Sequence, residues 1–169
     1  FIQRANHAIA QIQKMNIEEA KKNTFVAEAK FLRALTYFQL SNLFGDLPLY
    51  DETIDLNTEF ASLKKERSSL AEVRSFILND LAFAIQNLPV SYDAKFQGRI
   101  TQGAAYALRG KVHLYAKTWT EAIKDFEEIV YNKTNNYGYV LNNNYASLFK
   151  MDGDNSPEII FAIQNLGGT

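Results

Sequence analysis

Histidine and cysteine, two residue types that often mark catalytic and metal sites, are scarce or absent in this sequence. The only histidines, His7 and His113, lie far apart and show no metal-ligand spacing, so each is interpreted as structural or exposed. The sequence has no cysteine, which excludes disulfides, thiolate nucleophiles and cysteine metal sites within it. It also has no phosphate-binding glycine loop, nucleophile elbow or zinc motif. The residues therefore predict no cofactor, and these motifs single out no catalytic group and no metal site.

Two groups of charged residues are candidates for a catalytic or metal site. Glu28 and Arg33 are five residues apart and do not share a helix face, so each is expected to form a structural ion pair with a neighbouring helix. The oxygen-rich run Asp152-Gly153-Asp154-Asn155-Ser156, with Glu158, resembles the start of a calcium loop but lacks the glycine and the length of an EF-hand. A polar turn is the favoured interpretation, and calcium binding near 152–154 stays open.

Aromatic residues in two predicted surface loops are better candidates for binding. Sugars present apolar C–H faces and polar hydroxyls, so aromatic rings beside Asn, Asp and Arg suit them. The alternative is that these rings anchor the loops to the helical core. The candidates are Tyr50 and Phe60 in loop 50–67, and Tyr92 and Phe96 in loop 89–100.

The overall composition predicts one globular domain over 1–169. With 47% hydrophobic residues the chain can bury a sizeable core, and its net charge of −1 argues against nucleic-acid binding. No apolar run approaches the roughly 20 residues that span a bilayer. Because the sequence starts at Phe1 inside a helical pattern, we expect an internal piece of a longer protein, with any signal peptide or lipid-anchor cysteine outside it.

Hydrophobic periodicity predicts a mainly α-helical fold. Capping boxes are expected where two of the helices begin, at Ser69-Leu70-Ala71-Glu72 and at Thr118-Trp119-Thr120-Glu121. Thr24 is expected to cap the helix that contains 27–44. The apolar run in 157–165 predicts a buried strand, with 139–141 as the available partner. The predicted helices cover 2–14, 18–23, 24–44, 69–88, 101–117, 118–132 and 144–150.

The segment 27–44 is apolar on nearly every side, which is typical of a helix that is covered on several flanks. We expect it to be central, with Phe31 and Phe38 buried. Gly45 is suited to the position after a helix, and Pro48 prevents the helix from continuing, so the sharp end is explained locally.

The predicted helices 101–117 and 118–132 are joined by a short turn, so they should pack antiparallel. Gly110 is followed after twelve residues by Ala122 and after sixteen by Phe126. Small residues let two helices approach closely, and this spacing resembles a tetratricopeptide pair. Such pairs stack on neighbours to bury their outer faces.

Ordered sequence blocks resemble the SusD/RagB family of nutrient-binding outer-membrane lipoproteins of Bacteroidetes. The family pattern Glu-Ala-Arg-Phe-x-Arg-Ala, then Phe-Gly-Asp-x-Pro, is present as Glu28 to Ala34, with Lys30 in place of Arg, and as Phe44-Gly45-Asp46-Leu47-Pro48. Further blocks follow in family order at 79–89, 98–119 and 147–163. These motif residues are mainly architectural in the family.

The resemblance implies a tetratricopeptide-like helical scaffold with inserted loops and no catalysis. It implies a cell-surface lipoprotein that captures oligosaccharides, or peptides in some members, and delivers them to a SusC-like TonB-dependent transporter. The alternative is a helical-repeat scaffold that binds proteins and no sugar. A glycoside hydrolase is disfavoured, because hydrolysis needs two carboxyls about 5–9.5 Å apart and no pair is singled out.

Overall fold

The computed structural model describes residues 1–54, 64–131, 136–150, 153 and 156–163. The chain divides into two compact units, Phe1–Leu88 and Pro89–Thr169, and each is described by itself. The mainly α-helical fold is confirmed, since the described residues form five α-helices and two short 3-10 helices and no sheet. Within the described ranges, no helix is both long enough and apolar enough to cross a bilayer. The single domain over 1–169 stays a prediction.

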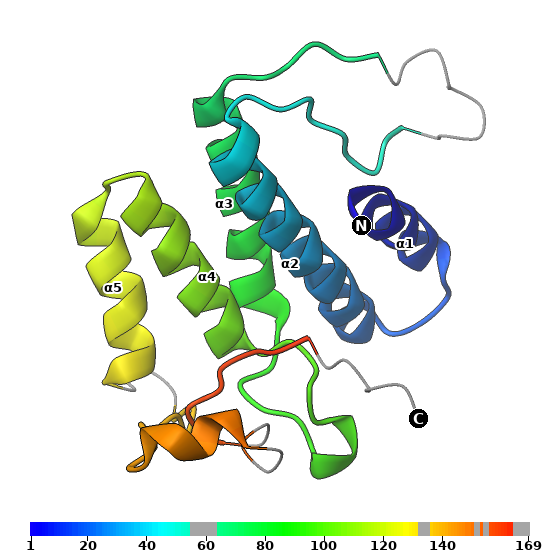
Figure 1. The fold of residues 1–169 in the computed structure, drawn as a ribbon. Coiled ribbons are helices and arrows are strands. Elements are labelled where there is room, and N and C mark those ends of the chain that lie inside the picture. The colour runs from blue at the N-terminus through cyan, green and yellow to red at the C-terminus, as the bar shows by residue number, and fades with distance from the viewer. Residues whose placement is uncertain (55–63, 132–135, 151–152, 154–155, 164–169) are drawn as a thin grey trace. The chain divides into compact units, whose positions relative to one another are not determined.

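The first unit contains α1 (Ile2–Lys14), α2 (Glu19–Phe44) and α3 (Leu70–Asn87), and α2 packs against both of the others (Figure 1). Phe31 and Phe38 are 2% and 6% exposed, so the prediction that both are buried is confirmed. On α3 the apolar residues at helical spacing are fully buried, which forms the core of the unit. These residues are Val73, Ile77, Leu81 and Ala84.

Two expectations about α2 were wrong. It is one continuous helix from Glu19, and Thr24 does not cap it. The Thr24 hydroxyl is instead within hydrogen-bond distance of the carbonyls of Ala20, at 3.0 Å, and of Asn87 at the end of α3, at 3.1 Å. The expectation that helices lie on more than one flank of α2 is confirmed by its packing against α1 and α3, and Leu43 near its end is 75% exposed. α1 and α3 cover two flanks of α2, and the side that carries Leu43 is exposed.

The turn that follows α2 is bonded to the start of α3, across the base of the long segment between the two helices. Gly45 has φ +70°, a conformation that costs little only for glycine. The Asp46 carboxylate accepts a hydrogen bond from the N–H of Leu70 at 2.8 Å, where the helix dipole favours a negative charge. Leu47 and Ser68 exchange backbone hydrogen bonds at 3.1 and 2.9 Å. The turn thereby closes the base of the loop between the two helices.

The predicted capping box at the start of α3 is confirmed. The Ser69 hydroxyl accepts from the N–H of Glu72 at 3.3 Å, and the Glu72 carboxylate accepts from the N–H of Ser69 at 2.8 Å. The N–H groups of Ser69 and Glu72 are each satisfied by a residue three positions away, which is why the sequence alone located this helix start.

The second unit contains η2 (Ala94–Phe96), α4 (Gln102–Tyr115), α5 (Trp119–Val130) and η3 (Tyr145–Phe149). Gly110 lies against the ring of Phe126: a Cβ at Gly110 would be 2.7 Å from the nearest ring carbon. Ala122 is buried at 3% exposure. The helices are also joined by a bidentate ion pair in which Arg109 donates to Asp125 at 2.6 and 2.8 Å.

The capping box predicted at Thr118 does not form, although α5 begins at the next residue. The Thr118 hydroxyl lies 2.8 Å from Nδ1 of His113 and 3.2 Å from the His113 carbonyl oxygen. Lys117 adopts φ +62°, and the N–H of Thr118 bonds to the same carbonyl at 3.0 Å. The Thr118 hydroxyl therefore bonds at the end of α4 and does not cap α5 as the sequence had predicted.

The predicted strand over 157–165 was wrong for its described part, 157–163, which forms no strand; 164 and 165 lie outside the described residues. The expected partner is adjacent, since the N–H of Val140 donates to the carbonyl of Pro157 at 3.3 Å. One such bond does not make a ladder. The apolar side chains of Ile159, Ile160 and Phe161 are half-buried and line a cavity.

Candidate functional site

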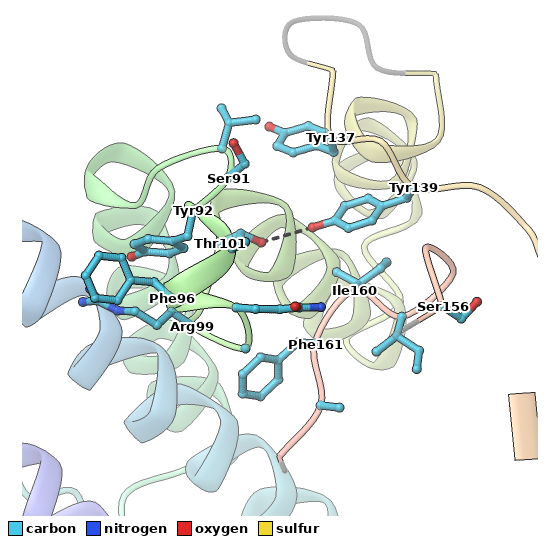
Figure 2. Close-up of a pocket in the computed structure, with 16 residues that line it drawn as sticks. Ser91, Tyr92, Phe96, Arg99, Thr101, Tyr137, Tyr139, Ser156, Ile160 and Phe161 are labelled. Carbon is cyan, nitrogen blue, oxygen red and sulfur yellow. Dashed lines mark hydrogen bonds between the residues drawn. The ribbon is translucent and has the colours of Figure 1, made fainter. Parts of the chain in front are cut away.

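A cavity of about 670 Å³ lies in the second unit and is called here the aromatic cavity (Figure 2). Its volume falls within the range of small-molecule sites. Three segments line it: the loop before α4, the segment around 137–139, and residues 156–162. The lining residues are Val90, Ser91, Tyr92, Ala94, Phe96, Gln97, Gly98, Arg99, Thr101, Tyr137, Tyr139, Ser156, Ile159, Ile160, Phe161 and Ala162.

One wall of the aromatic cavity is built by loop 89–100. The backbone turns through η2, where the N–H of Phe96 bonds to the carbonyl of Asp93 at 2.8 Å. Gly98, at φ +90°, then reverses the chain. As a result the Arg99 guanidinium lies 4.7 Å from the ring centre of Tyr92 and 5.6 Å from that of Phe96 (Figure 2). Cation–π attraction at these distances holds the three side chains as one group.

The opposite wall carries two stacked tyrosines (Figure 2). The rings of Tyr137 and Tyr139 are nearly parallel, with 5.9 Å between their centres and 6° between their planes. They lie against Gly103 of α4, where a Cβ would be only 2.6 Å from the Tyr139 hydroxyl. The Tyr139 hydroxyl is 3.1 Å from that of Thr101, and Tyr137 donates to Gln102 at 2.8 Å.

Burial raises the pKa of Tyr139, and the hydrogen bond with Thr101 opposes that shift without cancelling it. The phenol therefore stays protonated at neutral pH and retains a donor as well as an acceptor. The aromatic cavity thus combines flat apolar rings with hydroxyl and amide groups. This is the combination that binds both the C–H faces and the hydroxyls of a sugar.

The structure brings together only part of the predicted set of aromatics. Tyr92 and Phe96 both line the aromatic cavity. Tyr50 lines a different cavity in the first unit, and Phe60 lies outside the described residues. Tyr137, Tyr139 and Phe161 also line the aromatic cavity and were not among the predicted binding residues. The only local signal for the first two is the Tyr-Gly-Tyr spacing, which places two rings on the same side of an extended segment.

The second cavity, of about 870 Å³, runs along α1 and is called here the α1 cavity. Besides Tyr50, it is lined mainly by amide and charged side chains of α1 and by residues 51–54. The backbone of Tyr50 is fixed beneath it: its N–H donates to the Tyr37 hydroxyl at 2.8 Å, and its carbonyl accepts from Asn6 at 3.0 Å. With one aromatic ring besides its histidine, this cavity offers less of a stacking surface.

A buried ion-pair network holds the base of loop 50–67 to the helices. Arg33, 1% exposed, donates to both carboxylate oxygens of Asp80 on α3 at 2.7 and 2.8 Å. It also donates to Asn6 on α1 at 2.6 Å and to Glu52 at 2.5 Å. Lys30 donates to Asp80 at 3.0 Å. Glu28, the acidic residue of the Glu28–Ala34 block, is half-buried on α2.

The network shifts the pKa of two of its members. Burial disfavours the charged guanidinium of Arg33, but the hydrogen bonds and charges of Asp80 and Glu52 outweigh it, so the pKa of Arg33 is raised. Burial likewise disfavours the Glu52 carboxylate, but Arg33 outweighs it and the pKa of Glu52 is lowered. Both groups stay charged at neutral pH. Arg33 is therefore tied to all three helices of its unit and to the loop, a structural arrangement.

Among the described residues, no group of three or more His, Asp or Glu side chains is arranged to hold a metal ion. Asp152 and Asp154 of the oxygen-rich run lie outside the described residues, so the calcium hypothesis there is not tested. Glu158 accepts a hydrogen bond from the N–H of Asn142 at 2.8 Å, and Ser156 is 3.4 Å from the Asn142 amide. These two side chains take part in the packing of a polar turn.

Comparison with known proteins gives several SusD-like relatives. A SusD-like protein of Formosa agariphila, P25, is 30% identical over 147 residues, which cover 87% of this chain and 27% of that protein. A solved SusD-like protein of Bacteroides fragilis has a TM-score of 0.85 at 34% identity, covering 97% of this chain and 32% of that one. A solved laminarin-binding SusD-like protein has a TM-score of 0.84 at 33% identity, covering 95% and 34%. The chain thus spans about a third or less of these relatives.

The model of the SusD-like family described as starch-binding and associating with the outer membrane matches residues 1–114. The match covers α1 to the greater part of α4, including the Gly45–Pro48 turn and the Arg33 network. The family model matches more than half of the chain, and the relatives reported above are SusD-like proteins as well. The chain therefore belongs to the SusD-like family.

Proposed function

We propose that this chain is part of a glycan-binding protein and that the aromatic cavity contributes to capture of an oligosaccharide. The observation that carries the proposal is the cavity itself, in which rings on two facing walls are interspersed with hydroxyl and amide groups. The laminarin binding of one solved relative supports the same class of ligand. Stacking on each ring is worth ~1 kcal/mol, so several rings together can hold a flexible sugar chain.

Binding is proposed to occur without turnover. Glycoside hydrolysis uses a pair of carboxyl groups. The described residues that line the aromatic cavity include no aspartate or glutamate. The described part of the lining can therefore hold a sugar and supplies no pair of carboxyl groups for its hydrolysis.

The location of the protein and the partner that receives its ligand are also proposals. We infer a cell-surface lipoprotein of the outer membrane, anchored through a segment outside this chain, that delivers its ligand to a SusC-like TonB-dependent transporter. The family description, which associates its members with the outer membrane, supports this location. Co-purification of a TonB-dependent transporter with the tagged protein from its native membrane would test the partner, and a lipid-labelled N-terminus would test the anchor.

A second candidate function, a scaffold that binds proteins and no sugar, is favoured by one observation. Trp119, Ile123 and Val130 on α5 are each more than half exposed. Apolar side chains grouped on one helix are typical of surfaces that meet another protein.

Titration calorimetry of the purified protein against a panel of neutral and acidic oligosaccharides and short peptides distinguishes the candidates. We expect an oligosaccharide to bind, and chromatography to show it unchanged after incubation. Tyr92→Ala and Phe96→Ala should each weaken binding by ~1 kcal/mol. Phe149→Ala is the matched control, because Phe149 is an exposed aromatic outside the cavity lining.

Released sugar products would overturn binding without turnover, and peptide-only or no ligand binding would overturn the glycan assignment. If glycan binding survives alanine at Tyr50, Phe60, Tyr92 and Phe96 together, the binding site lies elsewhere in the protein. That outcome would reject the aromatic cavity while keeping the glycan function.

A further inference from the structure

The first turn of α4 contains a residue that local helix preference does not explain. Gly103 is the second residue of the helix, and it is buried. Glycine is a poor helix former compared with alanine, which occupies the next two positions of the same helix. A buried glycine inside a helix therefore indicates a neighbour that approaches the helix closely.

That neighbour is the pair of stacked tyrosines on the wall of the aromatic cavity. A Cβ at Gly103 would lie 2.6 Å from the Tyr139 hydroxyl oxygen, 2.7 Å from its ring carbon Cε2 and 3.0 Å from Cδ1 of Tyr137. Carbon atoms that are not bonded prefer separations of about 3.5–4.0 Å. An alanine at this position would therefore displace the Tyr139 ring from its place in the wall.

The two residues before Gly103 hold the tyrosines by their hydroxyl groups. The Tyr139 hydroxyl is 3.1 Å from that of Thr101, which is the N-cap of α4 (Figure 2). Tyr137 donates to the side chain of Gln102 at 2.8 Å. The segment that carries the two rings forms neither helix nor strand. The positions of the rings therefore depend on these contacts with α4 rather than on regular backbone pairing.

We propose that the first turn of α4 positions the Tyr137–Tyr139 stack for sugar binding, with Gly103 as the positioning residue. Because Gly103 has no side chain, both rings can lie against the helix in nearly the same orientation, with 6° between their planes. Stacking on a sugar requires an aromatic surface at van der Waals distance, so a displaced ring loses the contact. The inference rests on the proposed function and adds to it a residue outside the cavity lining.

Gly103→Ala and Gly110→Ala form a matched pair of substitutions. Both add a Cβ to a buried glycine of α4, and each Cβ would lie 2.7 Å from an aromatic ring carbon, of Tyr139 in one case and of Phe126 in the other. Phe126 does not line the aromatic cavity. Both variants should therefore lose stability, and only Gly103→Ala should change the wall that meets the ligand.

Titration calorimetry with neutral and acidic oligosaccharides, laminarihexaose among them, measures binding at a temperature where circular dichroism shows each variant folded. We expect Gly103→Ala to weaken binding about fivefold, the loss of roughly one ring contact, and Gly110→Ala to leave the affinity unchanged. In a Tyr139→Ala background, Gly103→Ala should weaken binding no further, because the ring through which it acts is absent.

A second variant tests the same turn without adding a clash. Gln102 does not line the cavity, and its side-chain oxygen accepts the hydrogen bond of Tyr137. Gln102→Met keeps the length of the side chain and replaces this acceptor with a much weaker one, so the Tyr137 ring is held less firmly. We expect it to weaken binding by at least about twofold, whether or not Gly103→Ala folds.

The outcomes separate this inference from the proposed function. Unchanged affinity in folded Gly103→Ala or in Gln102→Met overturns the positioning role and leaves glycan binding standing, and so does equal weakening by Gly110→Ala. Further weakening by Gly103→Ala in the Tyr139→Ala background overturns the route through that ring. If no oligosaccharide binds the wild-type protein, the glycan function fails and the positioning role fails with it.

Discussion

Asp80 is the acidic partner that the buried network of the first unit depends on most. It is 2% exposed and accepts three charge-assisted hydrogen bonds, two from Arg33 and one from Lys30. Asp80→Asn keeps the size of the side chain but removes its charge, and it turns an amide N–H₂ toward side chains that are themselves donors. Arg33 would then be left buried with Glu52 as its remaining carboxylate.

Breaking a buried ion pair on one side costs about 3–5 kcal/mol, because the other charge is left without its partner. Since Glu52 and Asn6 still accept from Arg33, we expect the lower end of that range, about 3 kcal/mol. Urea denaturation followed by far-UV circular dichroism measures the change in the free energy of unfolding. Glu19→Gln is the matched control, because its carboxylate is 73% exposed and its 3.4 Å pair with Lys22 should contribute less than about 1 kcal/mol.

A double-mutant cycle checks that the cost comes from the pairing. Arg33→Met should destabilise the wild type more than it destabilises Asp80→Asn, with a coupling of about 1–3 kcal/mol. If Asp80→Asn costs no more than Glu19→Gln, or if the two network substitutions are additive, the network does not hold these helices together as described.

Three further predictions concern stability. Gly110→Ala places a Cβ 2.7 Å from the Phe126 ring and should destabilise by ~1–3 kcal/mol in chemical denaturation; an unchanged midpoint would contradict the close crossing of α4 and α5. Lys117 has φ +62°, so Lys117→Gly should be stabilising by up to about 1 kcal/mol in a thermal melt, and a lower melting temperature would reject strain at this turn. The pKa of Glu52 is lowered in the folded protein, so its contribution is present above its ordinary pKa of 4.5 and is lost as the pH falls below that value. Glu52→Gln should therefore flatten the loss of unfolding free energy in acid, and an identical pH profile would show that the pairing with Arg33 contributes nothing.

Local chemistry alone located most of the helices. The capping box at Ser69, the glycine after α2 and Pro89 after α3 act through atoms a few residues away, so their effect is readable in the sequence. The burial of Phe31 and Phe38 also followed from the apolar pattern, because a helix places residues three or four apart on one face. The family blocks, too, were readable in the sequence.

Only the tertiary structure decided where side chains with several available partners bond. The hydroxyls of Thr24 and Thr118 bond to carbonyls at the ends of neighbouring helices, since a single hydroxyl serves whichever acceptor packing presents. The partners of Arg33 come from three segments that lie up to 47 residues from it in the sequence. The aromatic cavity likewise combines the loop before α4 with residues near 137–139 and 156–162, and no local spacing relates them. The sequence by itself determined the helices and two of the rings, and packing over long sequence distances decided which rings line one cavity together.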